Sequence, residues 1–132
     1  MIVLDTHVLV WWVDGETKKL SRKARQALEQ QRKRHELLVS SISIFEITTL
    51  ERRGRLRFGI PASEWLAQVR RLPEYRIEPL TDDIAERAGQ FGEAFPGDPA
   101  DRLISATALL AGVPLVTHDE RLRGIESLPT IW

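Results

Sequence analysis

Residues 98–119, DPADRLISATALLAGVPLVTHD, carry the pattern that decides the fold of this 132-residue chain. After a turn rich in proline and glycine, residues 99–111 are apolar on nearly every side of a helix, which predicts a central helix rather than a superficial one. Gly112 ends that helix, and residues 115–117 form a short buried strand that leads to Asp119. A buried helix followed at once by a buried strand is typical of an α/β protein.

Outside this stretch, short apolar runs of strand length alternate with segments of helical periodicity. The runs cover 2–4, 37–39 and 75–80, with 130–132 as a further short strand. Helices are predicted over 7–13, 21–31, 43–53 and 82–91, with a further one that begins at Pro61 and buries Trp65, Leu66 and Val69. Helices that connect parallel strands cover both faces of the sheet. The expected fold is therefore a three-layer α/β/α sandwich with a mainly parallel sheet, in a single domain over residues 1–132.

Serine and threonine mark the starts of several of these helices. Ser21 and Thr81 precede segments of helical periodicity and are predicted N-caps. Ser43 and Glu46 have the spacing of a capping box, so we expect Ser43 to open its helix and Glu46 to lie near the first turn. Asp101 has a similar place in its own helix, where a carboxylate interacts favourably with the positive end of the helix dipole.

Composition excludes several classes of protein. There is no cysteine, so disulfides, thiolate zinc sites and a cysteine nucleophile are ruled out. The start of the chain lacks a basic leader, and no run of about 20 apolar residues occurs, so we expect a cytoplasmic protein without a membrane partner. The phosphate-binding, dinucleotide-binding and nucleophile-elbow glycine motifs are all missing, and the three histidines have no metal-ligand spacing.

Charge is balanced over the whole chain but clustered locally. Nineteen basic and nineteen acidic residues give a formal net charge of zero, so any contact with nucleic acid must come from local clusters. Two exist: the run 18–34, and the arginines Arg52, Arg53, Arg55 and Arg57. The longer run is equally well explained as the solvated face of a helix.

Four acids occupy positions at the ends of predicted elements. Asp5 and Asp119 follow strands, and Glu46 and Asp101 lie near helix starts. Each acid alone is explained by an ordinary cap or turn. In an open α/β sheet, however, the crevice beyond the carboxyl ends of the strands is where ligands bind, so the four are expected to converge there. Clustered carboxylates without histidine or cysteine favour Mg²⁺ or Mn²⁺, ions that suit phosphodiester hydrolysis.

Four segments together resemble a known family. LDTHVLVWW at 4–12, SSISIFEITTLERRGRL at 40–56, DPADRLISATAL at 98–109 and PLVTHDERL at 114–122 are similar to the PIN domain, and more narrowly to VapC-type ribonuclease toxins. The resemblance covers nearly the whole chain in the family's order. It implies an α/β/α sandwich and an endonuclease that cuts RNA with Mg²⁺ or Mn²⁺.

The resemblance also implies roles for individual residues. The four acidic metal-binding positions of the family correspond to Asp5, Glu46, Asp101 and Asp119. Supporting positions correspond to Thr6, Thr117 and Asp98, and of the two acids in DPADR the one before Arg102 fits the family position better. The family's frequent lysine one turn after the glutamate is Leu50 here, a departure that leaves the acids intact. Arg52, Arg53 and Arg55 are the candidates to hold the RNA backbone.

Related toxins are homodimers held inactive by a cognate antitoxin, and the resemblance implies both partners here. An antitoxin segment over the acidic pocket could insert a basic side chain among the carboxylates, which suits the fork of an arginine. Trp11, Trp12 and Trp65 could supply apolar surface for that contact, although core packing is expected for at least two of them.

Two other classes of function fit part of the pattern. A phosphoacceptor receiver domain also uses acids at strand ends, but it needs adjacent acids after the first strand, an aspartate after a central strand and a late lysine. Here Asp5 stands alone, residues 37–41 end in serine, and no lysine follows Lys33. A binding module that kept the fold and lost catalysis is disfavoured by the presence of all four acids.

Overall fold

The computed structural model describes all 132 residues as a five-stranded sheet with helices on both faces. The strands are β1 (Ile2–Leu4), β2 (Leu37–Ser40), β3 (Tyr75–Glu78), β4 (Leu115–Val116) and β5 (Thr130–Ile131). The helices are α1 (Thr6–Val13), α2 (Arg22–Lys33), α3 (Ser41–Arg52), α4 (Ala62–Arg71), α5 (Asp82–Gln90), α6 (Pro99–Ala111) and α7 (Glu120–Arg123), with a 3₁₀ turn over Thr17–Lys19. The predicted sandwich is confirmed.

The sheet is parallel throughout, and its strand order is β3-β2-β1-β4-β5. The chain first builds outward from β1 through β2 to β3 and then returns to place β4 on the other side of β1. The direction of winding thus reverses between β1 and β4. Such a switch point opens a crevice at the carboxyl ends of the two strands, which is where α/β proteins bind ligands.

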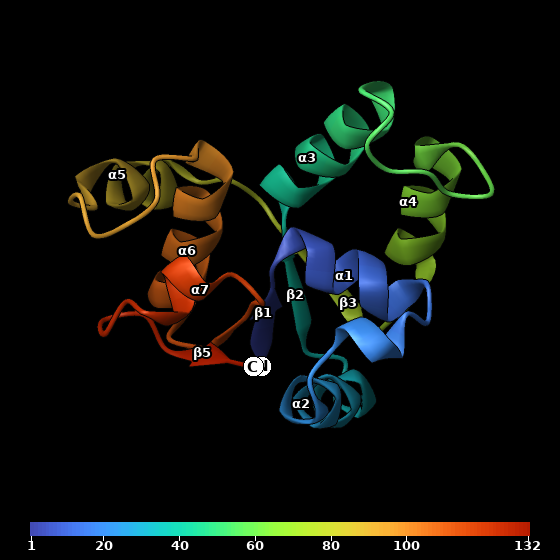
Figure 1. Ribbon diagram of the computed structural model, residues 1–132, viewed down its shortest axis with the longest axis horizontal. Coiled ribbons are helices and arrows are strands. Elements are labelled where there is room, and N and C mark those ends of the chain that lie inside the picture. The colour runs from blue at the N-terminus through green and yellow to red at the C-terminus, as the bar shows by residue number, and fades with distance from the viewer.

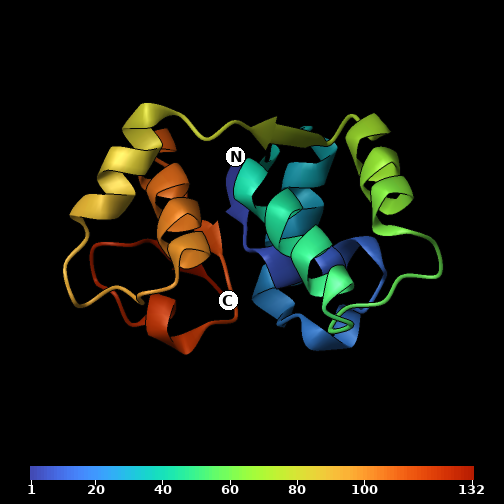
Figure 2. The ribbon, with the colours of Figure 1, turned by 90° about the horizontal axis from the view of Figure 1, so that it is seen from above.

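Alternate residues of the short strands point to opposite faces of the sheet. Ile2 and Leu4 of β1 belong to a core of sixteen buried residues that also includes side chains of α1, α2, α3 and α4. Val3 belongs to a second core of nine, formed with α6, α7 and the segment that follows α7. Figures 1 and 2 show the α5, α6 and α7 group on one side and α1, α2 and α4 on the other. Burial on both faces explains why these strands are apolar without alternation.

Most helix boundaries follow local capping chemistry. The hydroxyls of Ser21 and Thr81 accept hydrogen bonds from backbone N–H groups three residues on, as predicted. Gly112 ends α6 with φ of 69°, a left-handed conformation that glycine adopts without steric cost. None of the helices has the length and hydropathy that a membrane span requires.

The start of α3 differs from the prediction. α3 begins at Ser41, and its N-cap is Ser40, whose hydroxyl accepts a hydrogen bond from the backbone N–H two residues on. The predicted capping box of Ser43 and Glu46 is therefore wrong, because β2 continues directly into the helix with no intervening loop. Glu46 is the sixth residue of α3, beyond the first turn. Its side chain is thus free to face the crevice rather than the helix terminus.

Candidate active site

Asp5 lies at the switch point, immediately after β1, and is also the N-cap of α1. Its Oδ1 accepts a hydrogen bond of 2.9 Å from the Thr6 backbone N–H. Its Oδ2 accepts a hydrogen bond of 2.6 Å from the hydroxyl of Thr117, the buried residue that follows β4. Both oxygens are thus held in place, and the Asp5–Thr117 contact joins the two strands between which the winding reverses.

Thr6 and Ser43 link α1 to α3 beneath the site. Their hydroxyls lie 2.9 Å apart, and both residues are fully buried. This buried hydroxyl pair fixes the relative position of the two helices that carry Asp5 and Glu46. The Ser43 hydroxyl therefore positions an acid through Thr6 and not through a helix cap. The supporting position predicted for Thr6 is explained by this contact.

Asp98 and Asp101 have different places at the start of α6. Asp98 is the N-cap and accepts a hydrogen bond of 2.9 Å from the Ala100 backbone N–H. Asp101 lies in the first turn, and its side chain is only 13% exposed. Asp101 is therefore the more enclosed of the two acids, while the Asp98 carboxylate caps the N-terminus of α6.

The residue after Asp101 fixes the loop that leads to α6. The guanidinium of Arg102 donates hydrogen bonds to the backbone carbonyls of Ala88, Phe91, Gly92 and Pro96. This fan of contacts ties the end of α5 and the following turn to α6 and so sets the position at which Asp101 enters the crevice. Sequence reasoning assigned no structural role to Arg102.

Asp119 lies two residues after Thr117 and is the N-cap of α7. Arg121 donates to it from the backbone N–H at 2.9 Å and from guanidinium Nη2 to Oδ2 at 2.8 Å. The same Nη2 donates to Asp101 Oδ2 at 3.3 Å. Arg121 thus bridges two of the four acids, a role that sequence reasoning missed. The THDER segment contains this arginine, and its spacing from Asp119 was the available signal.

The carboxyl groups differ in their acidity for identifiable reasons. Burial raises the pKa of Asp5 and of Glu46, and in each case a neighbouring carboxylate raises it further. Burial, followed by the charges of Asp5, Asp98 and Asp119, raises the pKa of Asp101 from its usual 3.8 to about 7. The hydrogen bond from Arg121 instead lowers the pKa of Asp119. Burial therefore disfavours the charged forms of Asp5, Glu46 and Asp101, and a bound cation would favour those forms.

All four acids line one cavity of about 660 Å³. Its lining contains six carboxylates, a single arginine, two histidines, a valine and a tryptophan: Asp5, Glu46, Asp98, Asp101, Asp119, Glu120, Arg121, His7, His118, Val8 and Trp11. No three of the carboxylates and imidazoles are already close enough together to form a ready-made metal ligand set. The four acids that were predicted to converge thus line one cavity without forming a compact cluster.

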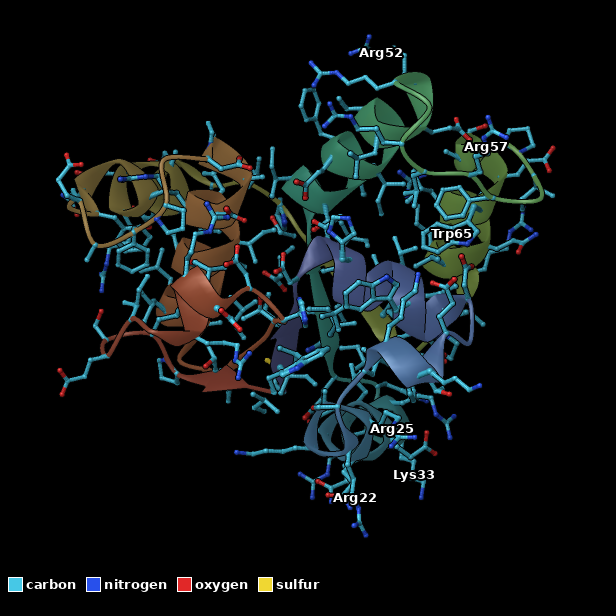
Figure 3. All side chains as sticks on the ribbon, in the orientation of Figure 1. Arg22, Arg25, Lys33, Arg52, Arg57 and Trp65 are labelled. Atoms are coloured by element: carbon cyan, nitrogen blue, oxygen red, sulfur yellow. The ribbon has the colours of Figure 1, made fainter.

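Arg52, Arg53 and Arg55 and the basic residues of α2 do not line this cavity. Arg52, Arg53 and Arg55 are exposed at the end of α3 and in the loop after it, and none lines the cavity. Figure 3 shows Arg52 at the far end of α3, and Arg22 and Lys33 on α2 at the opposite extreme of the molecule. A role of either cluster in holding RNA stays a prediction.

The three tryptophans of interest have separate surroundings. Trp65 is 5% exposed, stacks on Phe58 and donates its indole N–H to Asp14 at 2.9 Å. Trp12 packs partly buried against the larger core, and Trp11 does so at the edge of the acidic cavity. Core packing thus accounts for Trp65 and Trp12, and Trp11 alone faces the cavity.

Sequence and structure comparisons agree with this description. The chain is 43% identical over 122 residues to ribonuclease VapC22 of Mycobacterium tuberculosis (strain ATCC 25618 / H37Rv), a match over 92% of this chain and 89% of that protein. A chain of VapBC2 from Rickettsia felis bound to promoter DNA superposes with a TM-score of 0.69 at 18% identity, covering 98% of this chain and 97% of that one. A chain of a toxin–antitoxin complex from Klebsiella pneumoniae gives 0.64 at 24%, covering 96% and 94%. These two structures show the shared fold, and with the match of residues 2–128 to the PIN domain they lead to one conclusion: this chain belongs to the PIN domain family.

Proposed function

We propose that this protein is a divalent-metal-dependent endoribonuclease of the VapC toxin type. The observation that carries the proposal is the shared cavity at the β1–β4 switch point, lined by six carboxylates and one arginine. The 43% identity to a protein named as a ribonuclease supports RNA as the substrate class. The toxin–antitoxin complexes among the structural neighbours support a cognate antitoxin as the partner of this chain.

The donor set fits Mg²⁺ or Mn²⁺. The cavity offers carboxylate oxygens and no thiolate, and hard oxygen ligands suit these ions. The raised pKa values of Asp5, Glu46 and Asp101 show charge that a cation would relieve. Asp5, Asp101, Glu46 and Asp119 are the residues proposed to hold it. When bound, the cation supplies charge neutralisation at the phosphate and an acidified water.

The protein's own groups set the geometry of this reaction. Thr117 and the Thr6 backbone N–H hold the Asp5 carboxylate in one orientation, and the Thr6–Ser43 pair holds α3 against α1. Asp101 and Glu46 add two further carboxyl groups to the lining of the same cavity. Arg121, which bridges Asp101 and Asp119, is the one arginine of the cavity lining. Being 65% exposed, its side chain can leave the acids and contact a phosphate oxygen.

The same cavity explains how an antitoxin could inhibit the proposed ribonuclease. Arg121 already shows that a guanidinium fits between Asp101 and Asp119. A basic side chain from an antitoxin would form ion pairs with the remaining carboxylates and would compete with the metal for them. Inhibition is therefore expected to weaken as the concentration of Mg²⁺ or Mn²⁺ rises.

Cleavage of a panel of structured RNAs tests the function directly. The protein, freed of antitoxin, is incubated with each RNA in Mg²⁺, in Mn²⁺ and in EDTA, and Asp5→Asn is run in parallel. We expect cutting in the metal-containing samples, none in EDTA, and a loss of about 100-fold or more in Asp5→Asn, since metal-site substitutions are at least as costly as outer-shell ones. Circular dichroism checks that Asp5→Asn is folded. Absence of cutting by the folded, metal-loaded protein would favour a binding module instead.

A further inference from the structure

One wall of the acidic cavity is aromatic. We call His7, Trp11, His118 and Trp132 the aromatic rim. His7 precedes Trp11 by one helical turn, with ring centroids 5.9 Å apart, and His118 lies 5.8 Å from Trp11 at nearly a right angle. Trp132 completes the group, 6.4 Å from Trp11 and 5.2 Å from His118. The rim thus joins residues from the first helix, the segment after β4 and the far end of the chain.

Most of the side chains of the aromatic rim line the cavity, and its tryptophans also pack against the core. His7, Trp11 and His118 all line the cavity, and both histidines are exposed. Trp11 is half-buried, because one side of its indole packs against the larger core. This packing fixes the orientation of the ring before any ligand arrives. A ring held in place loses little side-chain entropy when it binds.

The negative charge of the cavity means that RNA binding needs an attraction that does not depend on the phosphates. Six carboxylates repel the phosphates of a nucleic acid, and metal can offset that repulsion only at the phosphate it contacts. Stacking of a base on an aromatic ring adds attraction that does not depend on phosphate charge. Lys19 is exposed, its Nζ lies over the Trp11 ring at 5.9 Å from the ring centre, and it pairs with Glu16 at 3.4 Å. A stacked base would displace this cation from the ring face toward the nucleotide's own phosphate.

We propose that Trp11, flanked by His7 and His118, is a stacking platform for one unpaired nucleobase of the RNA, beside the phosphodiester that is cut. This inference rests on the proposed ribonuclease function and specifies the form of its substrate. Proteins recognise unpaired RNA by stacking splayed-out bases on aromatic rings. The cleaved bond is therefore expected in a loop, bulge or single strand and not within a continuous duplex.

The neighbouring Trp12 provides a matched control. It lies on the same helix, is half-buried and packs against the same core, but it does not line the cavity. Trp11→Leu and Trp12→Leu therefore remove the same ring from adjacent positions and carry comparable risks for folding. Thermal melts of both variants confirm that each is folded under the binding conditions.

Binding is measured by fluorescence anisotropy in the Asp5→Asn background with Mn²⁺, so that the RNA stays intact. The probe is a labelled segment of about ten nucleotides around the site that the wild-type protein cuts, and each nucleotide in turn is replaced by an abasic one. We expect one abasic position to weaken binding. Trp11→Leu is expected to weaken it by about 5- to 150-fold, the range of one stacked base, and to abolish that abasic penalty. Trp12→Leu is expected to stay within about twofold of the reference.

Several results would overturn the platform. Equal weakening by both leucine variants would reduce Trp11 to a structural role. Unchanged RNA affinity in Trp11→Leu would show that the aromatic rim does not bind RNA and would favour the antitoxin as its ligand. If the abasic penalty persisted in Trp11→Leu, the base would have to stack on another residue. If the wild-type protein cuts no RNA at all, the proposed function and the platform fall together. If it cuts and the Trp11→Leu variant binds normally, only the platform falls.

Discussion

Charges on the surface helix α2 and charges in the cavity behave in opposite ways. On α2, Glu29 and Arg32 are partly exposed one turn apart and joined by a hydrogen bond of 3.0 Å, and the pKa of Glu29 lies below its usual value. In the cavity, burial holds the pKa values of Asp5 and Asp101 above theirs. The surface charges satisfy one another, whereas the cavity keeps an excess of negative charge at a cost in stability. Such an excess persists at sites that bind something the chain does not supply.

The largest expected change in stability comes from Asp101→Asn, which removes a carboxyl whose charged form the fold disfavours. Without metal, an unfolded Asp101 loses its proton near pH 4 while the folded one keeps it up to about pH 7. The folded state binds the extra proton, so stability of the wild-type protein falls as pH rises across this window. The variant lacks that penalty. Discounted for solvent screening, it should be more stable by about 1–2 kcal/mol at pH 8, and equally stable near pH 3.5.

Thermal melts in EDTA at several pH values measure this difference, which corresponds to about 3–6 °C in melting temperature. Added Mn²⁺ should reverse the order, because it stabilises the wild-type protein by binding its folded state. RNA cleavage by the variant should be lost. A variant that melts lower than wild type in EDTA at pH 8 would show that the Asp101 charge is not a source of strain.

A smaller effect is expected from Thr117→Val, which keeps the shape and removes the hydroxyl that donates to Asp5. The acid then loses its orientation, and substitutions of such supporting partners cost about 10–100-fold in metal affinity or activity. Mn²⁺ titration followed by calorimetry, together with RNA cleavage rates, measures both losses. Thr117→Ser restores the donor and should recover most of the activity. A loss in Thr117→Ser with none in Thr117→Val would show that the methyl group, not the hydroxyl, matters at this position.

The smallest effect is expected on α2. Glu29→Gln removes a partly exposed surface ion pair that water screens. Its melting temperature and RNA cleavage rate should match those of the wild-type protein within experimental error. A clear loss of RNA cleavage in this variant would extend the functional surface to α2 and would bring the 18–34 basic run into RNA binding.

Features with local causes could be predicted from the sequence. The caps at Ser21 and Thr81 depend on residues three positions away, and the buried strands depend on composition alone. The resemblance placed Asp5, Glu46, Asp101 and Asp119 on one cavity, and the structure does bring them to it. Metal binding by these four acids stays a prediction.

The errors and omissions come from long-range contacts. The segment VSSISIFE offers serines at 40, 41 and 43, each a plausible cap. What decides among them is that Ser43 turns inward to Thr6, a partner 37 residues earlier. The bridge from Arg121 to Asp101 likewise spans 20 residues and depends on where α7 begins. The hydrophobic periodicity of the sequence does not predict such long-range contacts.

The hydrogen bond between Thr117 and Asp5 joins positions 112 residues apart, and it has a consequence for the protein while it is being made. A ribosome that adds 5–20 residues per second reaches Thr117 on the order of ten seconds after Asp5. Until then β1 lacks β4, and the cavity lacks the lining residues that follow β4, among them Asp119 and Arg121. A growing chain is therefore inert towards RNA, including the message that encodes it, and the proposed activity begins only when the last quarter of the chain folds onto the first strand.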